Sequence, residues 1–388
     1  FEQALSPAAW TPPAMASIMT GTYPFQHQID NGAKVGAKSF NLPVLSKDHH
    51  TLAEHLQEAG YRTVGVTTNF HLAPKMGFDQ GFDEFIALGM VDDARKAGKA
   101  VQSIAGSLGP EQPWFLWVHI LDPHGPYFSN EPFASQYDRE LESRFDGVAE
   151  SRQARFKRHR TQYVREMEND PSTHAGSLGL ATLEALYDSE VQFVDGIIAK
   201  LTKTVPVDGN TMFVLTSDHG EEFREHGNLG HRRSLFQDQI HVPWVMVWPG
   251  VIQPSRITTP VTTVDLMPTV VELVTGFPPK EAVVTGKSHA RALQEGARPI
   301  ERDLYSELRV ANQYSWAVIR GGRKLINEVD AKHQILVDFA SDPTESVPIK
   351  ESAESESMEN SWLEARKSWP VLKAGQVHSY ASDEQIER

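Results

Sequence analysis

Asp218 and His219 are adjacent in the sequence and stand where an apolar segment gives way to a polar one. The preceding residues, 211–216, predict a buried strand, and Gly220 allows the backbone to turn away directly after the pair. In open α/β sheets, ligands collect at the carboxyl ends of the strands. One carboxylate oxygen and one imidazole nitrogen at such a position suit Zn²⁺ or Mn²⁺. The alternative is that the pair only caps a helix and satisfies backbone groups.

Three histidines are candidates for a pocket near this pair, and His124 is the one singled out for binding an oxyanion. His226 and His231 follow on the same loop, where both are able to face the same pocket. His124 follows a second predicted strand, at residues 114–120, which also ends in polar residues. Imidazole donates hydrogen bonds to oxyanions and titrates near neutral pH. A histidine on a loop bounded by proline is also common as a structural residue, so the sequence alone leaves both interpretations of His124 open.

Thr11 is the candidate nucleophile. It precedes Pro12 and Pro13, and Gly21 follows a short apolar segment. Proline favours the first turn of a helix and glycine its end, so we predict a helix with Thr11 at its N-terminus. Free N–H groups and the helix dipole favour an anion there, and a hydroxyl beside a metal ion can attack a phosphoryl or sulfuryl centre. The alternative is a threonine that only caps the helix.

The elements that must position these residues alternate between strand and helix. We predict strands at residues 62–68, 114–120, 211–216 and 241–248. We predict helices at residues 51–60, 92–108, 183–201 and 265–274. This alternation indicates a doubly wound α/β sheet.

Two other segments have a different pattern. After about residue 300, short strand-like runs separated by turns predict a small antiparallel sheet, with a helix at 361–367 and a loop over the acidic segment 351–360. Residues 132–173 are polar and carry a basic cluster between Arg152 and Arg160. Such a run is typical of a solvated face, and an insertion or lid beside the site is the alternative.

The composition is that of an ordinary globular protein of 388 residues, with 40% hydrophobic and 23% charged residues. A net charge of −14 argues against general nucleic-acid binding, because no excess of Lys and Arg exists to neutralise phosphates. Cysteine is absent, which excludes thiolate ligands and a cysteine nucleophile. No apolar run approaches the roughly 20 residues that cross a bilayer. These features assign neither an oligomeric state nor a periplasmic, secreted or cytoplasmic location.

Several segments, in this order, together resemble the sulfatase branch of the alkaline-phosphatase superfamily. They are WTPPAMASIMTGTYPFQHQI, GFDQGFDEF, WFLWVHILDPHGPY, TSDHGEEFREHG, HVPWVMVWPG and TVDLMPTVVELV. The likeness covers nearly the whole chain. It implies a doubly wound mixed sheet flanked by helices in residues 1–300, with the first strand missing. It also implies a small C-terminal antiparallel α+β subdomain in residues 301–388.

The resemblance assigns roles to individual residues. Thr11 falls at the nucleophile position, where it also contacts the metal, and Asp218 and His219 fall on the metal-binding pair. His124 and His231 fall on residues that bind the anion. The implied function is a metal-dependent hydrolase of sulfate or phosphate esters. Its cofactor would be a divalent ion, Mn²⁺, Zn²⁺, Mg²⁺ or Ca²⁺, and its partner a small-molecule ester.

The sequence departs from the family pattern at two places. Sulfatases convert a Cys or Ser at the nucleophile position to formylglycine, which Thr11 cannot become, and Met15 stands where the family usually has an Arg. Threonine at this position favours a phosphodiesterase or phosphonate hydrolase. The family also begins with a strand that carries acidic metal ligands, and we expect this chain to be incomplete at that end. The alternatives are a phosphoethanolamine-type transferase and a non-catalytic binding protein on a sulfatase scaffold.

Overall fold

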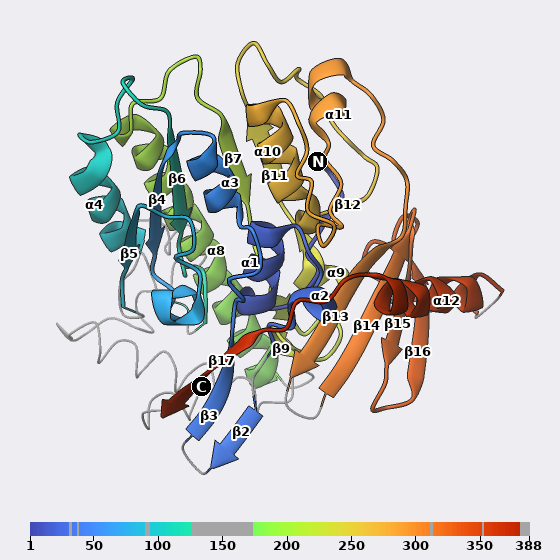
Figure 1. Ribbon diagram of the computed structural model, residues 1–388. Coiled ribbons are helices and arrows are strands. Elements are labelled where there is room, and N and C mark those ends of the chain that lie inside the picture. The colour runs from blue at the N-terminus through green and yellow to red at the C-terminus, as the bar shows by residue number, and fades with distance from the viewer. Residues whose placement is uncertain are drawn as a thin grey trace.

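The structure is a computed structural model. It describes residues 1–30, 33–36, 39–89, 94–125, 127, 174–310, 313–350 and 353–380. The polar segment 132–173, with its basic cluster, lies outside the described residues. Figure 1 shows a large α/β region beside a smaller antiparallel sheet that carries one helix. The structure thus has the predicted fold class, a mixed α/β architecture flanked by helices.

Parallel strands form one part of the β-structure of the large region. β4 (Arg62–Thr67) lies between β5 (Glu84–Ala87) and β6 (Trp114–His119) and is parallel to both. β7 (Phe213–Thr216) pairs antiparallel with β11 (Trp244–Val247). The predicted strand at 241–248 is divided into β10 (His241–Val242) and β11, with Pro243 between them. Proline cannot donate to a strand ladder, which explains the division.

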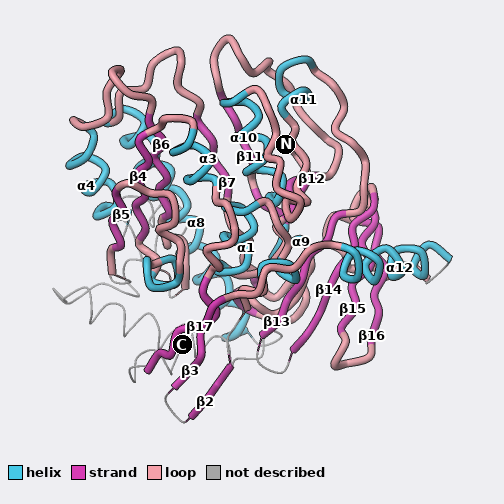
Figure 2. Tube along the Cα trace, in the orientation of Figure 1, coloured by secondary structure: helices cyan, strands magenta, loops and turns pink. Residues whose placement is uncertain are grey.

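The principal helices of the large region are α1 (Thr11–Thr20), α3 (Leu52–Glu58), α4 (Ala94–Ala105), α8 (His174–Thr204) and α10 (Leu266–Thr275). The smaller elements are β1 (Ala4–Leu5), α2 (Pro24–His27), β2 (Ala33–Gly36), β3 (Ser39–Val44), β8 (Glu222–Phe223), β9 (Leu229–Gly230), α9 (Gln237–Ile240), β12 (Val261–Thr262) and α11 (Ala290–Glu295). Short 3-10 turns span Phe70–Leu72, Pro74–Met76 and Thr263–Asp265. Figure 2 shows the long loops that connect these elements.

Alternating side chains of β4 and β6 show that helices cover both faces of the sheet. Val64 and Val66 pack with the buried face of α4, and Leu116 from β6 joins them. Phe115 and Trp117, which alternate with Leu116, pack instead against the cluster formed by α1, α3 and α10. Successive residues of a strand point to opposite faces, so the two clusters lie on opposite sides. α1 is buried along its whole length within the second cluster.

The C-terminal part contains the antiparallel sheet predicted after residue 300. β13 (Leu304–Val310), β14 (Gln313–Arg320), β15 (Arg323–Glu328) and β16 (His333–Asp338) pair in sequence order. α12 spans Ala353–Ser368, so the prediction of a loop over the acidic segment is wrong. The segment is helical because Met358 and Trp362, four residues apart, lie on one face and are buried against the sheet.

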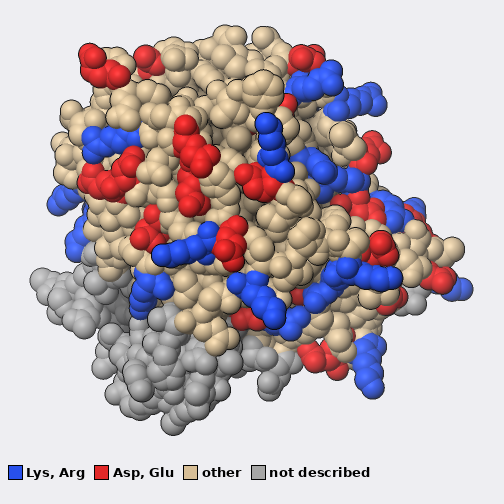
Figure 3. Space-filling view, in the orientation of Figure 1, with Lys and Arg blue, Asp and Glu red and all other residues tan. Residues whose placement is uncertain are grey.

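The last strand leaves this small sheet. β17 (Gly375–Tyr380) pairs antiparallel with β3, far away in the sequence. The boundary between two domains at residue 300 stays a prediction. Among the described residues, no helix combines the length and apolar character that crossing a bilayer requires. Figure 3 shows acidic and basic side chains of the described residues interspersed over one face of the molecule.

Candidate active site

The turn after β7 places Asp218 and His219 at the carboxyl end of the strand, as predicted. The chain turns sharply at Gly220, whose N–H donates to the carbonyl of Gln239 at 2.9 Å. A Cβ atom on Gly220 would lie 2.1 Å from the carbonyl oxygen of Asp238. Only glycine fits this close approach, so the residue after the Asp-His pair fixes how the pair is presented.

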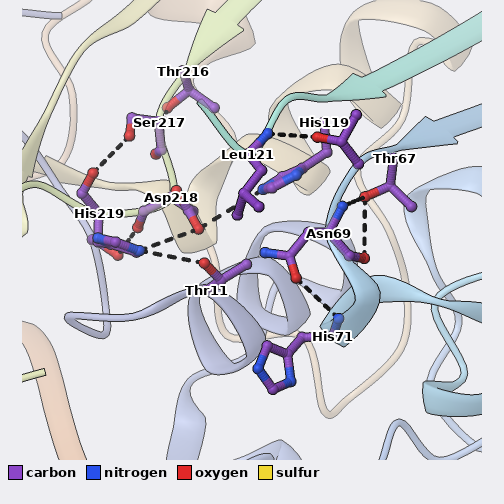
Figure 4. A network of polar contacts seen from close by, with 12 residues as sticks. Thr11, Thr67, Asn69, His71, His119, Leu121, Thr216, Ser217, Asp218 and His219 are labelled. Atoms are coloured by element: carbon purple, nitrogen blue, oxygen red, sulfur yellow. Dashed lines mark hydrogen bonds and ion pairs between the residues drawn. The ribbon is translucent and has the colours of Figure 1, made fainter. Parts of the chain in front are cut away.

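Thr11 is the first residue of α1, and its side chain faces His219. Its Oγ1 lies 3.3 Å from Nε2 of His219 (Figure 4). The ring's other nitrogen, Nδ1, lies 2.7 Å from the carbonyl oxygen of Gly220 and therefore carries the proton. Nε2 then presents a lone pair, and the Thr11 hydroxyl donates to it. Trp10 is the N-cap and no side chain caps the helix, so Thr11 is not the capping residue of the structural alternative.

Asp218 has a carboxylate oxygen that the described protein does not satisfy. Its Oδ2 is buried without a hydrogen-bond partner among the described residues. The imidazole nitrogens nearest to Oδ2 are Nε2 of His219 at 3.6 Å and Nε2 of His119 at 3.9 Å. Burial alone would raise the pKa of Asp218, but His219 and His119 lower it well below its usual range. An ionised, unsatisfied oxygen beside an imidazole lone pair is a donor set that fits a divalent cation.

The rings of three histidines follow one another across the site. The centroid of His219 lies 4.3 Å from that of His231, which lies 5.0 Å from that of His124. His124 donates from Nδ1 to the carbonyl of Gly125 at 2.6 Å. The structure therefore brings Thr11, Asp218, His219, His231 and His124 into one site, from four separate parts of the chain. The sequence placed each at a strand end or helix start, and the fold joins them.

Glu221 holds His231 in place and was not singled out from the sequence. Its Oε1 accepts from Nδ1 of His231 at 2.8 Å, and its Oε2 accepts from the Tyr127 hydroxyl at 2.9 Å. Burial would raise the pKa of Glu221, but His231 lowers it through its charge and its hydrogen bond. Glu221 is thus a carboxylate, and its partners fix its orientation. Because Nδ1 of His231 is committed to Glu221, Nε2 is the nitrogen left for a ligand.

Burial keeps His124 and His71 neutral in the protein without ligand. It lowers the pKa of His124 to about 4, with a further contribution from His231. It lowers the pKa of His71 to about 3, with a further contribution from Arg232. Figure 4 shows His71 and Asn69 in the turn after β4, which contacts α1 near Thr11. A bound anion would oppose the burial effect and favour the protonated rings.

Some residues of this site were not predicted from the sequence, because tertiary contacts bring them to it. His71, Arg232 and Glu221 reach the site from loops, and only the fold brings them together. The guanidinium of Arg232 lies 4.3 Å from the ring centroid of Trp10, next to Thr11. His119 was visible as a polar strand end, but nothing in the sequence paired it with Asp218. His226 is not part of the row of rings; it stacks on Phe236 at 3.6 Å.

Two proteins of known sequence that are similar to this chain are both named as sulfatases. Arylsulfatase K of Danio rerio is 26% identical over 196 residues, which cover 47% of this chain and 37% of that protein. N-acetylglucosamine-6-sulfatase of Capra hircus is 25% identical over 309 residues, which cover 70% of this chain and 54% of that protein. The chain thus spans about half or less of the length of these relatives.

Solved structures with the same fold include two of different stated activity. One, determined in complex with its substrate D-glucosamine-2-N,6-O-disulfate, has a TM-score of 0.72 at 18% identity and covers 95% of this chain and 90% of its own. A phosphonate monoester hydrolase from Silicibacter pomeroyi has a TM-score of 0.65 at 17% identity and covers 95% and 88%. At these identities the likeness concerns the fold. The family model described as Sulfatase matches residues 1–277, and the chain belongs to the sulfatase family of the alkaline-phosphatase superfamily.

Proposed function

We propose that this protein is a metal-dependent hydrolase that uses Thr11 as its nucleophile. We further propose that phosphate diesters or phosphonates are better substrates than sulfate esters. One observation carries the proposal: the Thr11 hydroxyl, at the buried N-terminus of α1, lies 3.3 Å from the unprotonated nitrogen of His219. A metal ion bound by this nitrogen would lie next to the Thr11 hydroxyl, and a hydroxyl so placed, in a site that favours anions, is poised for nucleophilic attack.

Members of the sulfatase family typically use a divalent metal ion. Asp218 and His219 would supply two of its ligands here, and the unsatisfied Oδ2 of Asp218 is the observation that supports this role. A bound ion of this kind lowers the pKa of a coordinated hydroxyl and neutralises charge on the ester. With one carboxylate and one imidazole, Mn²⁺ or Zn²⁺ is expected ahead of Mg²⁺ or Ca²⁺.

The first chemical step transfers the phosphoryl group to the protein. The Thr11 hydroxyl loses its proton to solvent, Oγ1 attacks phosphorus, a Thr–O–P bond forms, and the bond from phosphorus to the leaving oxygen breaks. We propose that His124 and Arg232 stabilise the non-bridging oxygens. His231 is the candidate acid, because Glu221 fixes its Nδ1 and leaves Nε2–H of the protonated ring to donate to the leaving alkoxide.

The second step releases the protein. Water attacks phosphorus and gives one proton to Nε2 of His231, which the first step left without it. The Thr–O–P bond breaks, Thr11 regains a proton from solvent, and a phosphate monoester (from a diester) or a free phosphonate (from a phosphonate monoester) leaves. In the alternative function, a transferase, another alcohol would replace the water. The relatives that the chain matches are named as sulfatases, whereas a threonine nucleophile favours an ester of phosphorus as the substrate. A formylglycine hydrate expels sulfate by collapsing to the aldehyde, and a threonine ester has no such route.

A substrate panel tests the proposal. The full-length protein, loaded with Mn²⁺ or Zn²⁺, is assayed on an aryl sulfate, an aryl phosphate diester and an aryl phosphonate. The diester or phosphonate should be cleaved fastest, and mass spectrometry of quenched protein should show the substituted phosphoryl group, or the phosphonyl group, added to the peptide containing Thr11. Thr20→Ala is the matched control, because Thr20 lies in the same helix and its hydroxyl donates to the carbonyl of Ala16 at 2.7 Å.

Three results would contradict the proposal. Sulfatase activity that exceeds the other two and survives Thr11→Ala would show that threonine is not the nucleophile. Activity that is unchanged after complete removal of metal would exclude the metal-dependent mechanism. If the metal-loaded protein binds phosphate or sulfate but turns over no substrate, the non-catalytic binding protein would be the better interpretation.

A further inference from the structure

A second cluster of metal-ligating side chains lies away from the active site, between α3 and the loop after α10. His50 directly precedes Thr51, the N-cap of α3, and His55 lies in the last turn of the helix. Glu281 lies in the loop that follows α10. Each of the three residues offers a ligand atom within 4.8 Å of the others. Figure 1 shows α3 and α10 close to each other, and the two helices are in contact.

Two atoms in this cluster are buried and face each other without a hydrogen bond. Nε2 of His55 and Oε2 of Glu281 have no hydrogen-bond partner among the described residues. They lie 3.7 Å apart, too far for a hydrogen bond. Two ligands of one tetrahedral Zn²⁺, with bonds of about 2.0–2.1 Å, lie roughly 3.4 Å apart. The separation therefore suits an ion placed between the two atoms.

His50 completes the group. Its Nδ1 lies 3.0 Å from Oε1 of Glu281, and its ring stacks on that of His55 with centroids 4.0 Å apart. Its Nε2 lies 3.3 Å from Oε1 of Glu58. A histidine that binds a metal usually donates its other N–H to a carboxylate. Nδ1 of His50 can thus bind an ion while Nε2–H donates to Glu58.

We propose that His50, His55 and Glu281 bind one Zn²⁺ ion at a site separate from the active site. Two imidazoles and one carboxylate are ligands that Zn²⁺ accepts, and water takes the fourth position. The site joins residues more than 200 positions apart in the sequence, and the bound ion fastens the loop after α10 to α3. Its role is structural, and it does not depend on the proposed hydrolase activity.

The experiment counts ions and measures stability. The full-length protein, His55→Gln and Glu281→Gln are dialysed against Zn²⁺ and then against buffer, and zinc per chain is measured. The natural protein should hold one ion more than either variant. Zn²⁺ should also raise its Tm by at least about 2 °C more than theirs, because an ion that binds only the folded state stabilises it. His333→Gln is the matched control, since His333 contacts Glu328 at 3.2 Å on the surface without a third ligand.

The outcomes separate this site from the catalytic one. Asp218→Asn should lose turnover and the active-site ion while keeping the ion held by His50, His55 and Glu281. Equal zinc content and equal rises in Tm for the natural protein, His55→Gln and Glu281→Gln would overturn the proposal. If His55→Gln does not fold, Glu281→Gln, which keeps the size of the side chain, decides on its own. Co²⁺ in place of Zn²⁺ should give the visible spectrum of a tetrahedral ion in the natural protein and in Asp218→Asn, and not in His55→Gln or Glu281→Gln.

Discussion

Two buried Asp-His pairs in this molecule have similar residues and opposite surroundings. Asp265 accepts hydrogen bonds from Nε2 of His289 at 3.0 Å, from the N–H of Lys287 at 2.7 Å and from the guanidinium of Arg302. Both its oxygens are satisfied, and its side chain is 1% exposed. Asp218, beside His219, has an oxygen with no hydrogen-bond partner among the described residues.

The contrast separates a carboxylate that stabilises the fold from one that is available to a ligand. A buried charge is tolerated where the protein supplies its partners, and it destabilises the fold where it does not. Burial opposes ionisation of Asp265, and Arg302 and His289 more than reverse this, so its pKa is lowered. The pKa of Asp218 is lowered too. Ionisation does not distinguish the two aspartates; what distinguishes them is an unsatisfied oxygen.

Loss of turnover in Asp218→Asn and Thr11→Ala is the largest effect we expect. Each should lower kcat/KM by at least about 10³-fold, because one removes a ligand charge and the other the nucleophile. Neither should lower the free energy of unfolding by more than about 1 kcal/mol, since Asp218 has an unsatisfied oxygen and Thr11→Ala removes only one long hydrogen bond. Steady-state kinetics and urea denaturation of both variants check this. A large loss of stability in Asp218→Asn would remove the contrast with Asp265.

The opposite result is expected for Asp265→Asn. It should lower the free energy of unfolding by about 3–5 kcal/mol, because Arg302 and His289 lose a buried counter-charge. The kcat of the folded protein should be unchanged. Urea denaturation at neutral pH, with active-site titration to count folded molecules, measures both. A fall in kcat without a fall in the free energy of unfolding would show that Asp265, like Asp218, serves the reaction and not the fold.

The Asp265–His289 pair predicts how the free energy of unfolding depends on pH. The pKa of Asp265 in the folded protein lies below its unfolded value of about 3.9, so its contribution is fully present above that value. As the pH falls through the folded pKa, Asp265 becomes protonated and the contribution is lost. The difference in unfolding free energy between the natural protein and Asp265→Asn should be constant from about pH 5 to 7 and shrink below about pH 4. A constant difference down to pH 3 would contradict the assignment.

The sequence predicted Asp218 and His219 at a strand end because the change from apolar to polar residues is local. The helix that begins at Thr11 is local in the same way, since Pro12, Pro13 and Gly21 mark its ends. The sequence could not show that Asp218 has an unsatisfied oxygen whereas Asp265, at the start of a predicted helix, has both oxygens satisfied. Which aspartate meets a guanidinium depends on Arg302, and that contact exists only after β13 has docked beside the large region. Glu221 and His71 were missed for the same reason.

Substitution of His124 or His231 should lower turnover less than substitution of Thr11 or Asp218. His124→Ala and His231→Ala should each lower kcat by on the order of 10²-fold, as the loss of one preorganised donor does. Circular dichroism and Tm should be close to those of the natural protein, because both rings lie at strand ends outside the main core clusters. His226→Ala is the matched control on the same loop and should keep full activity. Unfolding of both variants would show that these histidines serve the fold.

The smallest effect on kcat is expected for Glu221, which would contact His231 and not the ester. Glu221→Gln keeps an acceptor for Nδ1 of His231 but removes the charge, so it should lower kcat by roughly tenfold, in the range seen when a supporting carboxylate is lost. KM should change little, and the alkaline limb of the pH–rate profile, which reports the group that protonates the leaving alkoxide, should move. Tyr127→Phe removes only the hydroxyl that donates to the other oxygen of Glu221 and should have a smaller effect in the same direction. A variant series in which Tm falls but the pH profile stays fixed would make Glu221 structural, like Asp265. A shifted profile at constant Tm would place it with the acid that protonates the leaving group.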